Sequence, residues 1–187
     1  MAPVRPIHLY LALLGLVLLE RGAELAVSGR NARRALARGG VESGRGHYLA
    51  MVAFHAAFLP ALAVAALRDP RPPPPAAWLA VAGAVLAQAL RWWAVAALDG
   101  RWTTRVIVVP GEPPVTGGPY RMLRHPNYVA VILEMACLPL AWGLWRLALL
   151  FGAGNAVLLL LRVRAEERAL GPAWERAFEG KGRFLPA

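Results

Sequence analysis

Two short polar segments in the second half of the chain carry the side chains best suited to chemistry. The first, 117–128, reads Gly-Gly-Pro-Tyr-Arg-Met-Leu-Arg-His-Pro-Asn-Tyr. Its glycines and first proline predict a turn at which the backbone can approach a ligand closely. Pro126 suits the first turn of a helix, whose free amide groups attract anions, so a carboxylate or phosphate could dock beside Arg124 and His125. Topology-setting arginines next to an ordinary helix start explain the same residues equally well.

The second segment, 162–168, reads Arg-Val-Arg-Ala-Glu-Glu-Arg. Its paired carboxylates, Glu166 and Glu167, could hold ribose hydroxyls or an ammonium group. A solvated helix turn with ion pairs at helical spacing is the simpler explanation of this segment on its own. Glu134 differs because it lies inside an apolar block, where a charge is costly and by default functional. We expect Glu134 to face the interior of a helix bundle and to pair with Arg91 or a histidine.

Five apolar blocks must position these segments, at 6–27, 47–67, 76–98, 128–142 and 144–161. The first three match the ~20 residues that cross a hydrocarbon core, and the last two read as a tight helical hairpin. The chain of 187 residues is 58% hydrophobic and only 17% charged, which excludes a soluble globule and a disordered chain. We therefore predict an all-α integral membrane protein with about five transmembrane helices.

The basic residues fall unevenly in the gaps between these blocks. The segments 28–46, 99–127 and 162–187 hold fifteen of the 21 Lys and Arg residues, whereas the remaining gaps hold four. The positive-inside rule then predicts an N-terminus outside and a C-terminus in the cytoplasm. The net charge of +10 thus reflects topology, and we expect no nucleic-acid partner. The single cysteine, Cys137, allows no internal disulfide, and we predict no metal site.

The two polar segments together resemble the isoprenylcysteine carboxyl methyltransferase (ICMT) family. The shared pattern is Gly118-Pro-Tyr-x-x-x-Arg-His-Pro-x-Tyr128, then an apolar hairpin, then Arg162-Val-x-x-Glu-Glu-x-x-Leu170. The resemblance implies an integral membrane enzyme that uses S-adenosylmethionine. It also implies one membrane domain over 1–187, with a two-span half at 1–75 and a cofactor-binding methyltransferase core at 76–187. The tail, 165–181, has the spacing of an amphipathic helix, which would cap a cytoplasmic cofactor pocket.

The resemblance assigns roles to the residues at matching positions. The cofactor pocket would be lined by Gly118, Pro119, Tyr120, Arg124, His125, Pro126, Tyr128, Glu166 and Glu167. Arg162 and Arg164 would anchor an anionic oxygen of the methyl acceptor. A phenolic acceptor would also need a general base, and His47 or His55 in the second block could serve. The alternative for each histidine is a packed interfacial residue, which suits His55 better than His47.

The first half of the chain resembles a bacterial branch of this family, found beside type III polyketide synthases, through residues that include Glu24, His47 and His55. Members of that branch O-methylate alkylpyrones and alkylated phenolic lipids. We therefore expect a lipophilic acceptor that enters sideways from a bacterial inner membrane, with protein partners left open. A prenylated protein terminus is the alternative acceptor. A sterol-type reductase that uses NADPH is a further alternative, although such enzymes usually have a glycine and an acid where this chain has Val129 and Ala130.

Overall fold

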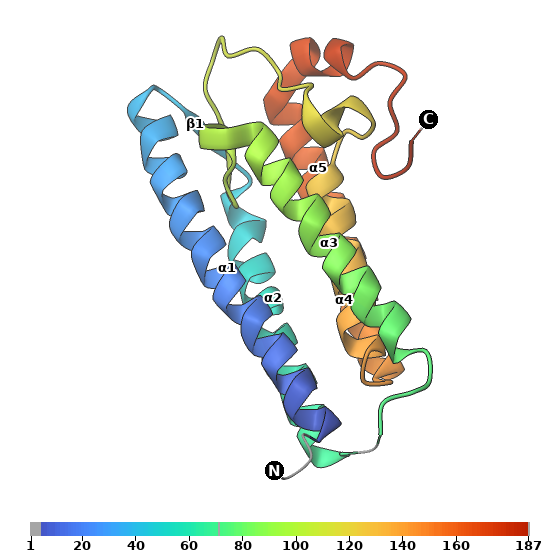
Figure 1. Ribbon diagram of the computed structural model, residues 1–187. Coiled ribbons are helices and arrows are strands. Elements are labelled where there is room, and N and C mark those ends of the chain that lie inside the picture. The colour runs from blue at the N-terminus through green and yellow to red at the C-terminus, as the bar shows by residue number, and fades with distance from the viewer. Residues whose placement is uncertain (1–4, 71, 187) are drawn as a thin grey trace.

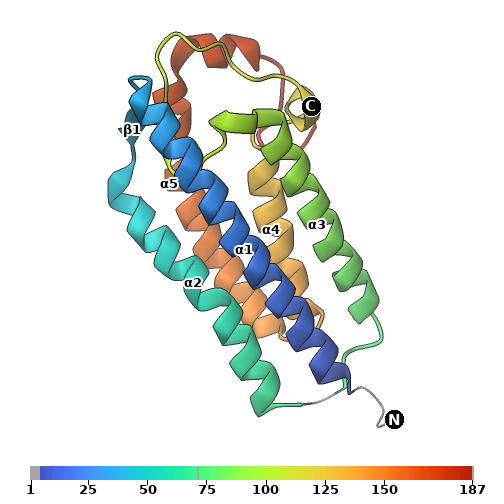
Figure 2. The same cartoon turned by 60° about the vertical axis from the view of Figure 1, so that its left-hand side comes forward.

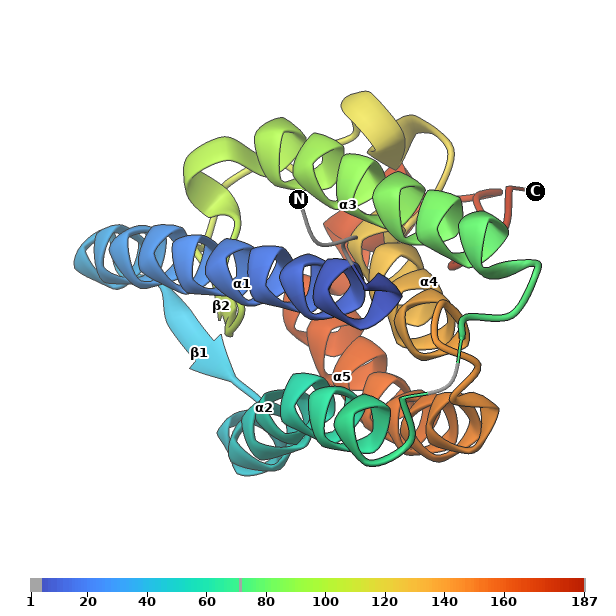
Figure 3. The same ribbon diagram turned by 60° about the horizontal axis from the view of Figure 1, so that its bottom comes forward.

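The computed structural model describes residues 5–70 and 72–186, without the side chain of His47. Most of these residues form five helices that run alongside one another (Figure 1). Their bounds are Pro6–Ala37 (α1), Arg45–Arg68 (α2), Ala77–Leu98 (α3), Pro126–Leu140 (α4) and Trp145–Ala177 (α5). Seen end-on, α4 lies between α3 and α5, and α2 lies beside α5 (Figure 3). The predicted apolar blocks therefore each form one helix.

Three of the described stretches are long and apolar enough to cross a membrane: Tyr48–Arg68, Ala77–Arg101 and Trp145–Ala177. Helix α4 is apolar but has only 15 residues. Helix α1 has 32 residues and extends well beyond the predicted block. The extension is stable because Asn31 and Ala32 are buried, and the Asn31 amide donates a hydrogen bond to the Trp102 carbonyl (2.9 Å).

A small sheet departs from the predicted all-α fold. Strand β1 (Val41–Ser43) pairs antiparallel with β2 (Val106–Val108), and Glu42 lies opposite Ile107. The β-branched composition of 103–110 predicts an extended segment there, whereas β1 carries no such pattern. A side-chain clamp reinforces the pairing, because Arg105 donates two hydrogen bonds to the Glu42 carboxylate and Arg45 donates another at 2.7 Å.

The arginine-rich segments gather at one end of the bundle. The loops around the sheet, the chain from 99 to 125 and the chain after α5 all lie there, while the α2–α3 and α4–α5 connections lie at the other end (Figures 1 and 2). The predicted topology requires this grouping. At the opposite end an aromatic core closes the bundle, where Tyr10 stacks on Trp142 (5.1 Å between ring centroids) and donates a hydrogen bond to the Leu138 carbonyl (3.0 Å).

The predicted tail helix at 165–181 is not a separate element. Residues 165–170 continue α5, and the direction changes only at Gly171, which has a φ of 71° (Figure 2). Glycine tolerates this left-handed conformation, and Pro172 has no N–H with which to continue the ladder of helical hydrogen bonds. The tail is helical as far as Ala177, as its amphipathic spacing predicts, but the helix changes direction within the segment 165–181 and not at its start.

Candidate active site

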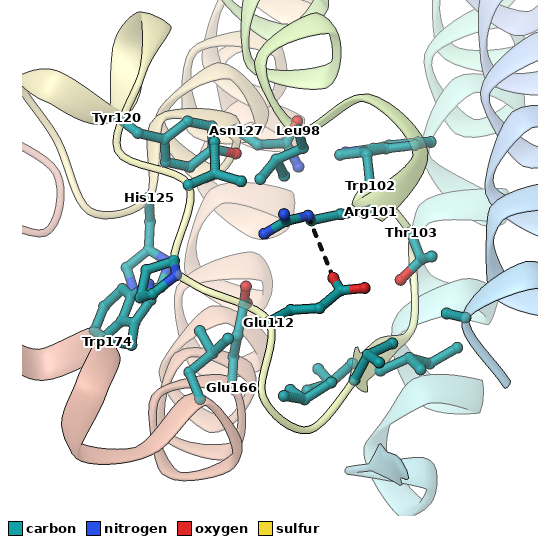
Figure 4. A pocket seen from close by; sticks show the side chains of 18 of the residues that line it. Leu98, Arg101, Trp102, Thr103, Glu112, Tyr120, His125, Asn127, Glu166 and Trp174 are labelled. Atoms are coloured by element: carbon teal, nitrogen blue, oxygen red, sulfur yellow. Dashed lines mark ion pairs between the residues drawn. The ribbon is translucent and has the colours of Figure 1, made fainter. Parts of the chain in front are cut away.

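A cavity of ≈200 Å³ lies at the arginine-rich end of the bundle (Figure 4). Charged side chains line it together with apolar ones, and we call it the polar cavity to distinguish it from a second, more apolar one. Its walls come from six places: the end of α1, the end of α3, the short helix η1 (Asp99–Arg101) with the residues after it, β2 with the loop after it, the segment from η2 (Gly118–Arg121) into α4, and α5. Glu112 stands in the loop and is held by two arginines, Arg38 (2.6 Å) and Arg101 (3.3 Å). The loop thus lies across the cavity, tied to α1 and η1 by ion pairs.

The turn at Gly118 brings Tyr120 to the cavity wall. Gly118 has a φ of 57°, and a Cβ atom there would lie 2.8 Å from the Cβ of Ala97 on α3. Only glycine fits this close approach without strain. Burial raises the pKa of the Tyr120 phenol well above its usual range, so the side chain is an uncharged hydroxyl at neutral pH.

The chain after α5 holds the Arg124-His125 pair in place. The Arg124 amide donates to the Gly182 carbonyl (3.0 Å) and the His125 amide donates to the Arg183 carbonyl (3.1 Å). The Arg124 guanidinium also donates to the Lys181 carbonyl (2.6 Å). We call residues 181–183 the strap, because these hydrogen bonds hold the Arg124 and His125 side chains at the edge of the cavity.

The two adjacent carboxylates of α5 have different partners. Glu166 lines the cavity and accepts a hydrogen bond from the Tyr128 hydroxyl, which in turn accepts one from Nε of Arg162 (2.6 Å). Glu167 accepts two hydrogen bonds from Arg183 (2.8 and 2.7 Å) and lies 3.2 Å from Nε2 of His125. Glu166 is therefore placed to meet a ligand, whereas Glu167 supports the strap.

A second, largely apolar cavity of ≈520 Å³ lies inside the helical part of the bundle. It runs between α1 and α2 over α4 and α5, and along α2 it extends from Tyr48 to Ala63, about 22 Å of helix. Leu18, Leu25 and Val52 line it and are themselves exposed, so the cavity opens on the flank of the bundle that would face lipid.

The two cavities share one wall. The residues that line both are Trp102, Thr103, Asn127, Tyr128 and Arg162. Arg162 is only 6% exposed, and its guanidinium reaches across to α2, where Nη1 lies 3.8 Å from Sδ of Met51. Oδ1 of Asn127 is buried, and no hydrogen-bond partner for it occurs among the described residues. This wall therefore offers both a buried cation and an unused acceptor.

Glu134 pairs as predicted. Its carboxylate accepts hydrogen bonds from Arg91 (2.7 Å) and Gln88 (3.1 Å), while Arg21 and Glu24 of α1 pair beside it (2.8 Å). These charges ring one side of the apolar cavity and join α1, α3 and α4. Arg91, Glu24 and Glu134 are nearly inaccessible to solvent, with the Arg91 side chain 5% exposed, whereas Arg21 is partly exposed.

The structure separates the predicted site residues into groups. Tyr120, Arg124, His125, Tyr128, Arg162 and Glu166 line the polar cavity. Gly118, Pro119, Pro126 and Glu167 shape it from behind. Arg164 lies on the exposed face of α5 and lines neither cavity. The predicted base His47 lies on α2, but its side chain is outside the described residues.

Several residues that line the polar cavity were not predicted from the sequence. Asn127 stands inside the first polar segment and could have been found from its position between Pro126 and Tyr128. Glu112 is an acid in an otherwise basic segment, which is a weaker signal. Trp102 and Thr103 have no local signature, because the loop that carries them reaches the site only through contacts with α1 such as the hydrogen bond from Asn31 to Trp102.

Comparison with known proteins agrees with this geometry. The model of the isoprenylcysteine carboxyl methyltransferase (ICMT) family matches residues 78–172. The chain belongs to the ICMT family. It is also 37% identical over 159 residues to the uncharacterized protein YpbQ of Bacillus subtilis (strain 168), across 84% of this chain and 94% of that protein.

The ICMT match confirms the predicted family and a membrane methyltransferase. It covers α3, α4 and α5 as far as the kink, and therefore includes most of the polar cavity with Tyr128, Arg162 and Glu166. It does not include α1 and α2, which supply much of the apolar cavity. The part shared across the ICMT family thus coincides with the polar site.

Proposed function

We propose that this ICMT-family protein is an S-adenosylmethionine-dependent O-methyltransferase for a lipophilic acceptor. One observation carries the proposal: a polar cavity and an apolar cavity meet at a single wall built by Asn127, Tyr128 and Arg162. A water-soluble methyl donor suits the first cavity, and a lipid suits the second. The shared wall is where a methyl group could pass from one to the other.

The residues of the polar cavity suit adenosylmethionine. This cofactor supplies an electrophilic methyl group on a sulfonium cation. Glu166 could accept hydrogen bonds from ribose hydroxyls or lie beside the positive charge, and the unused Oδ1 of Asn127 offers another acceptor. Tyr120 and Trp174 add flat apolar surface for a purine ring.

NADPH suits the cavity less well. It carries two nucleotides and an additional phosphate, so it needs more room and free cations. The five arginines that line the cavity among the described residues are already engaged: Arg38 and Arg101 bind Glu112, Arg105 binds Glu42, Arg162 binds Tyr128, and Arg124 donates to the Lys181 carbonyl. A reductase would have to break these pairs, whereas a single nucleoside with a zwitterionic tail would not.

The chain contributes mainly positioning. Methyl transfer is an in-line displacement, so holding the acceptor oxygen in line with the methyl group and excluding water provide most of the rate. Arg162 is buried and would attract an anionic acceptor oxygen, while its hydrogen bond to Tyr128 holds the guanidinium in one place. Trp102, itself buried, adds apolar surface to the same wall.

We favour an alkylpyrone or alkylphenolic lipid as the acceptor. A ring on a long chain needs only a groove that leads to the shared wall, and the apolar cavity is such a groove. A prenylated protein terminus, the alternative, would also have to bring a peptide past the loop tied down by Glu112. We further propose one membrane domain in which all five helices cross a bacterial inner membrane with the C-terminus inside.

Equilibrium binding to the purified protein in detergent tests the cofactor assignment. We expect labelled adenosylmethionine to bind and NADPH not to compete. Binding of NADPH alone would instead support the reductase. Methyl transfer from labelled adenosylmethionine to alkylpyrones, alkylresorcinols and a farnesylcysteine analogue then tests the acceptor. Turnover of farnesylcysteine and of no ring lipid would overturn the favoured acceptor and leave the cofactor assignment intact.

A further inference from the structure

His55 faces the apolar cavity with one ring nitrogen already committed. Its Nδ1 lies 2.8 Å from the carbonyl oxygen of Met51, one helical turn earlier on α2. A carbonyl only accepts, so Nδ1 must carry the proton of this hydrogen bond. In the neutral ring Nε2 is then unprotonated and carries a lone pair, and no hydrogen bond to it occurs among the described residues.

The ring lies close to the shared wall. Side chains on a helix tilt toward its N-terminus, and for α2 that direction leads to the arginine-rich end. The hydrogen bond to Met51 confirms that the ring turns back over the preceding turn. Met51 is the residue that contacts the Arg162 guanidinium (3.8 Å), and Arg162 in turn binds Tyr128. The His55 ring and the Arg162 guanidinium thus both contact Met51, one at its carbonyl and one at its sulfur, and both line the cavity in which an acceptor would lie.

Charged groups surround this position from every helix that lines the cavity. Arg21 and Glu24 come from α1, Arg91 from α3, Glu134 and the Tyr128 hydroxyl from α4, Arg162 from α5, and the Tyr48 hydroxyl from α2 itself. The two carboxylates of the cavity, Glu24 and Glu134, already pair with Arg21 and Arg91. Arg162 adds a further cation, so these surroundings favour the neutral ring, which is the form that can accept a proton.

We propose that Nε2 of His55 takes the proton of acceptors that arrive as neutral hydroxyls. This inference rests on the proposed function. The acceptor O–H bond breaks, and its proton goes to Nε2 while the oxygen forms a bond to the methyl carbon. The carbon–sulfur bond breaks, and its electron pair remains on sulfur, which becomes neutral. The positive charge of the sulfonium is thereby replaced by that of the imidazolium, and the net charge of the site is unchanged.

The assignment separates two classes of acceptor. A carboxylate or a strongly acidic enol arrives ionised and needs Arg162 but not His55. A simple alkylphenol arrives neutral and needs both. A general base of this kind typically contributes about 100-fold to 10,000-fold in rate. His55→Gln should therefore impair weakly acidic acceptors selectively.

A spectroscopic test needs no cofactor and no turnover. A long-chain alkyl-4-nitrophenol is added to the purified protein in detergent, and the absorbance of its phenolate is followed at fixed pH. We expect the wild-type protein to raise the phenolate fraction on binding and His55→Gln to reduce the rise, with the remainder due to the Arg162 guanidinium. His8→Gln is the matched control, because His8 is exposed on α1 near the opposite end of the bundle.

Turnover supplies the second measurement. A long-chain alkylphenol and its ring-fluorinated analogue have nearly the same shape but differ in acidity. His55→Gln should lower kcat for the alkylphenol about 100-fold and should affect the fluorinated analogue much less, and added imidazole should partly rescue His55→Ala. An unchanged phenolate signal, or an equal loss with both phenols, would overturn the role of His55. A His55-dependent phenolate signal without methylation of any acceptor would count against the proposed function alone.

Discussion

Glu166 and Glu167 are neighbours in the chain that the structure assigns to different tasks. Successive residues on a helix point about 100° apart, so one carboxylate can face a cavity while the next faces the chain that follows α5. Glu166 meets Tyr128 at the polar cavity, and Glu167 meets Arg183 on the strap. Replacing either glutamate by glutamine removes one negative charge and keeps the size of the side chain, so the effects of the two substitutions can be compared directly.

We expect Glu166→Gln to weaken adenosylmethionine binding by about 10-fold or more, because a hydrogen bond to a charged group is worth about 1.5–3 kcal/mol. Glu167→Gln should instead loosen the strap. Its main effect should be a lower midpoint of thermal unfolding, with a smaller loss of affinity. Isothermal titration and thermal unfolding in detergent measure both quantities.

Glu175→Gln provides the control, because Glu175 is exposed beyond the kink of α5 and lines neither cavity. If Glu167→Gln weakened cofactor binding more than Glu166→Gln, the assignment of Glu166 to the cofactor would be wrong. The strap would then be the more important element.

The same helical geometry explains which properties of the individual site residues could be predicted from the sequence and which could not. The motif pattern identifies Arg162 and Arg164 together, but residues two apart lie on nearly opposite sides of a helix. Only the packing of α5 against α2 and α4 decides that Arg162 is buried and Arg164 exposed. Likewise, the tautomer of His55 depends on the carbonyl that its ring meets, which no pattern in the chain encodes.

Helices α1, α3 and α4 are joined by buried charges. The pair between Arg91 and Glu134 lies where hydrocarbon would otherwise surround it. Removal of Arg91 leaves the buried Glu134 carboxylate with only the more distant Arg21 (3.7 Å) to balance its charge. We expect Arg91→Met to destabilise the protein by about 3–5 kcal/mol. Thermal unfolding in detergent should show a clear drop in midpoint, while Arg146→Met, at an exposed position, should show little change.

The double variant Arg91→Met with Glu134→Leu decides whether the loss of stability in Arg91→Met comes from the unbalanced charge or from altered packing. With both partners apolar, the poorly balanced Glu134 carboxylate is gone while Arg21 and Glu24 still pair (2.8 Å), and much of the lost stability should return. If the double variant were as unstable as Arg91→Met, packing at these positions would matter more than the ion pair.

The clamp between the strands predicts a dependence on pH. Hydrogen bonds from Arg105, and then from Arg45, hold the pKa of Glu42 below its usual range in spite of some desolvation. A carboxyl group with a lowered pKa in the folded state adds stability above its unfolded pKa of about 4.3, and this stability is lost as the pH falls through the folded pKa.

We therefore expect Glu42→Gln to lower the unfolding midpoint at pH 7 and to differ less from wild type as the pH falls below about 4. Thermal unfolding measured across this range checks the prediction. A constant difference between the two proteins at every pH would show that the clamp does not depend on the charge of Glu42.

At the scale of elements, the helices could be predicted and the sheet could not. A run of about 20 apolar residues has one stable solution in a membrane, so composition suffices for the long spans. Strand β1 has three residues, and its partner β2 lies more than sixty positions away. The pairing forms because α1 and η1 bring the two segments together, and that contact has no local signature.

The whole molecule has one arginine-rich end, and cysteine labelling can place it relative to the membrane. In a Cys137→Ala background, reporters at Gly46 and Ala76 mark the two ends, since both positions are exposed. We expect an impermeant reagent added to intact cells to label Ala76→Cys and to spare Gly46→Cys until the cells are opened. The reverse pattern would put the polar cavity outside the cell, away from any cytosolic cofactor.

The shared wall between two cavities also bears on the order of events in a catalytic cycle. One cavity opens at the end of the bundle and the other on its flank, so neither ligand blocks the path of the other. In the proposed reaction, donor and acceptor can therefore arrive in either sequence, and each product would leave into a different phase, water or bilayer. Initial rates should follow a random ternary-complex scheme, with intersecting lines in double-reciprocal plots. Lipid dilution in mixed micelles should then change the apparent KM for the acceptor and leave that for the donor untouched.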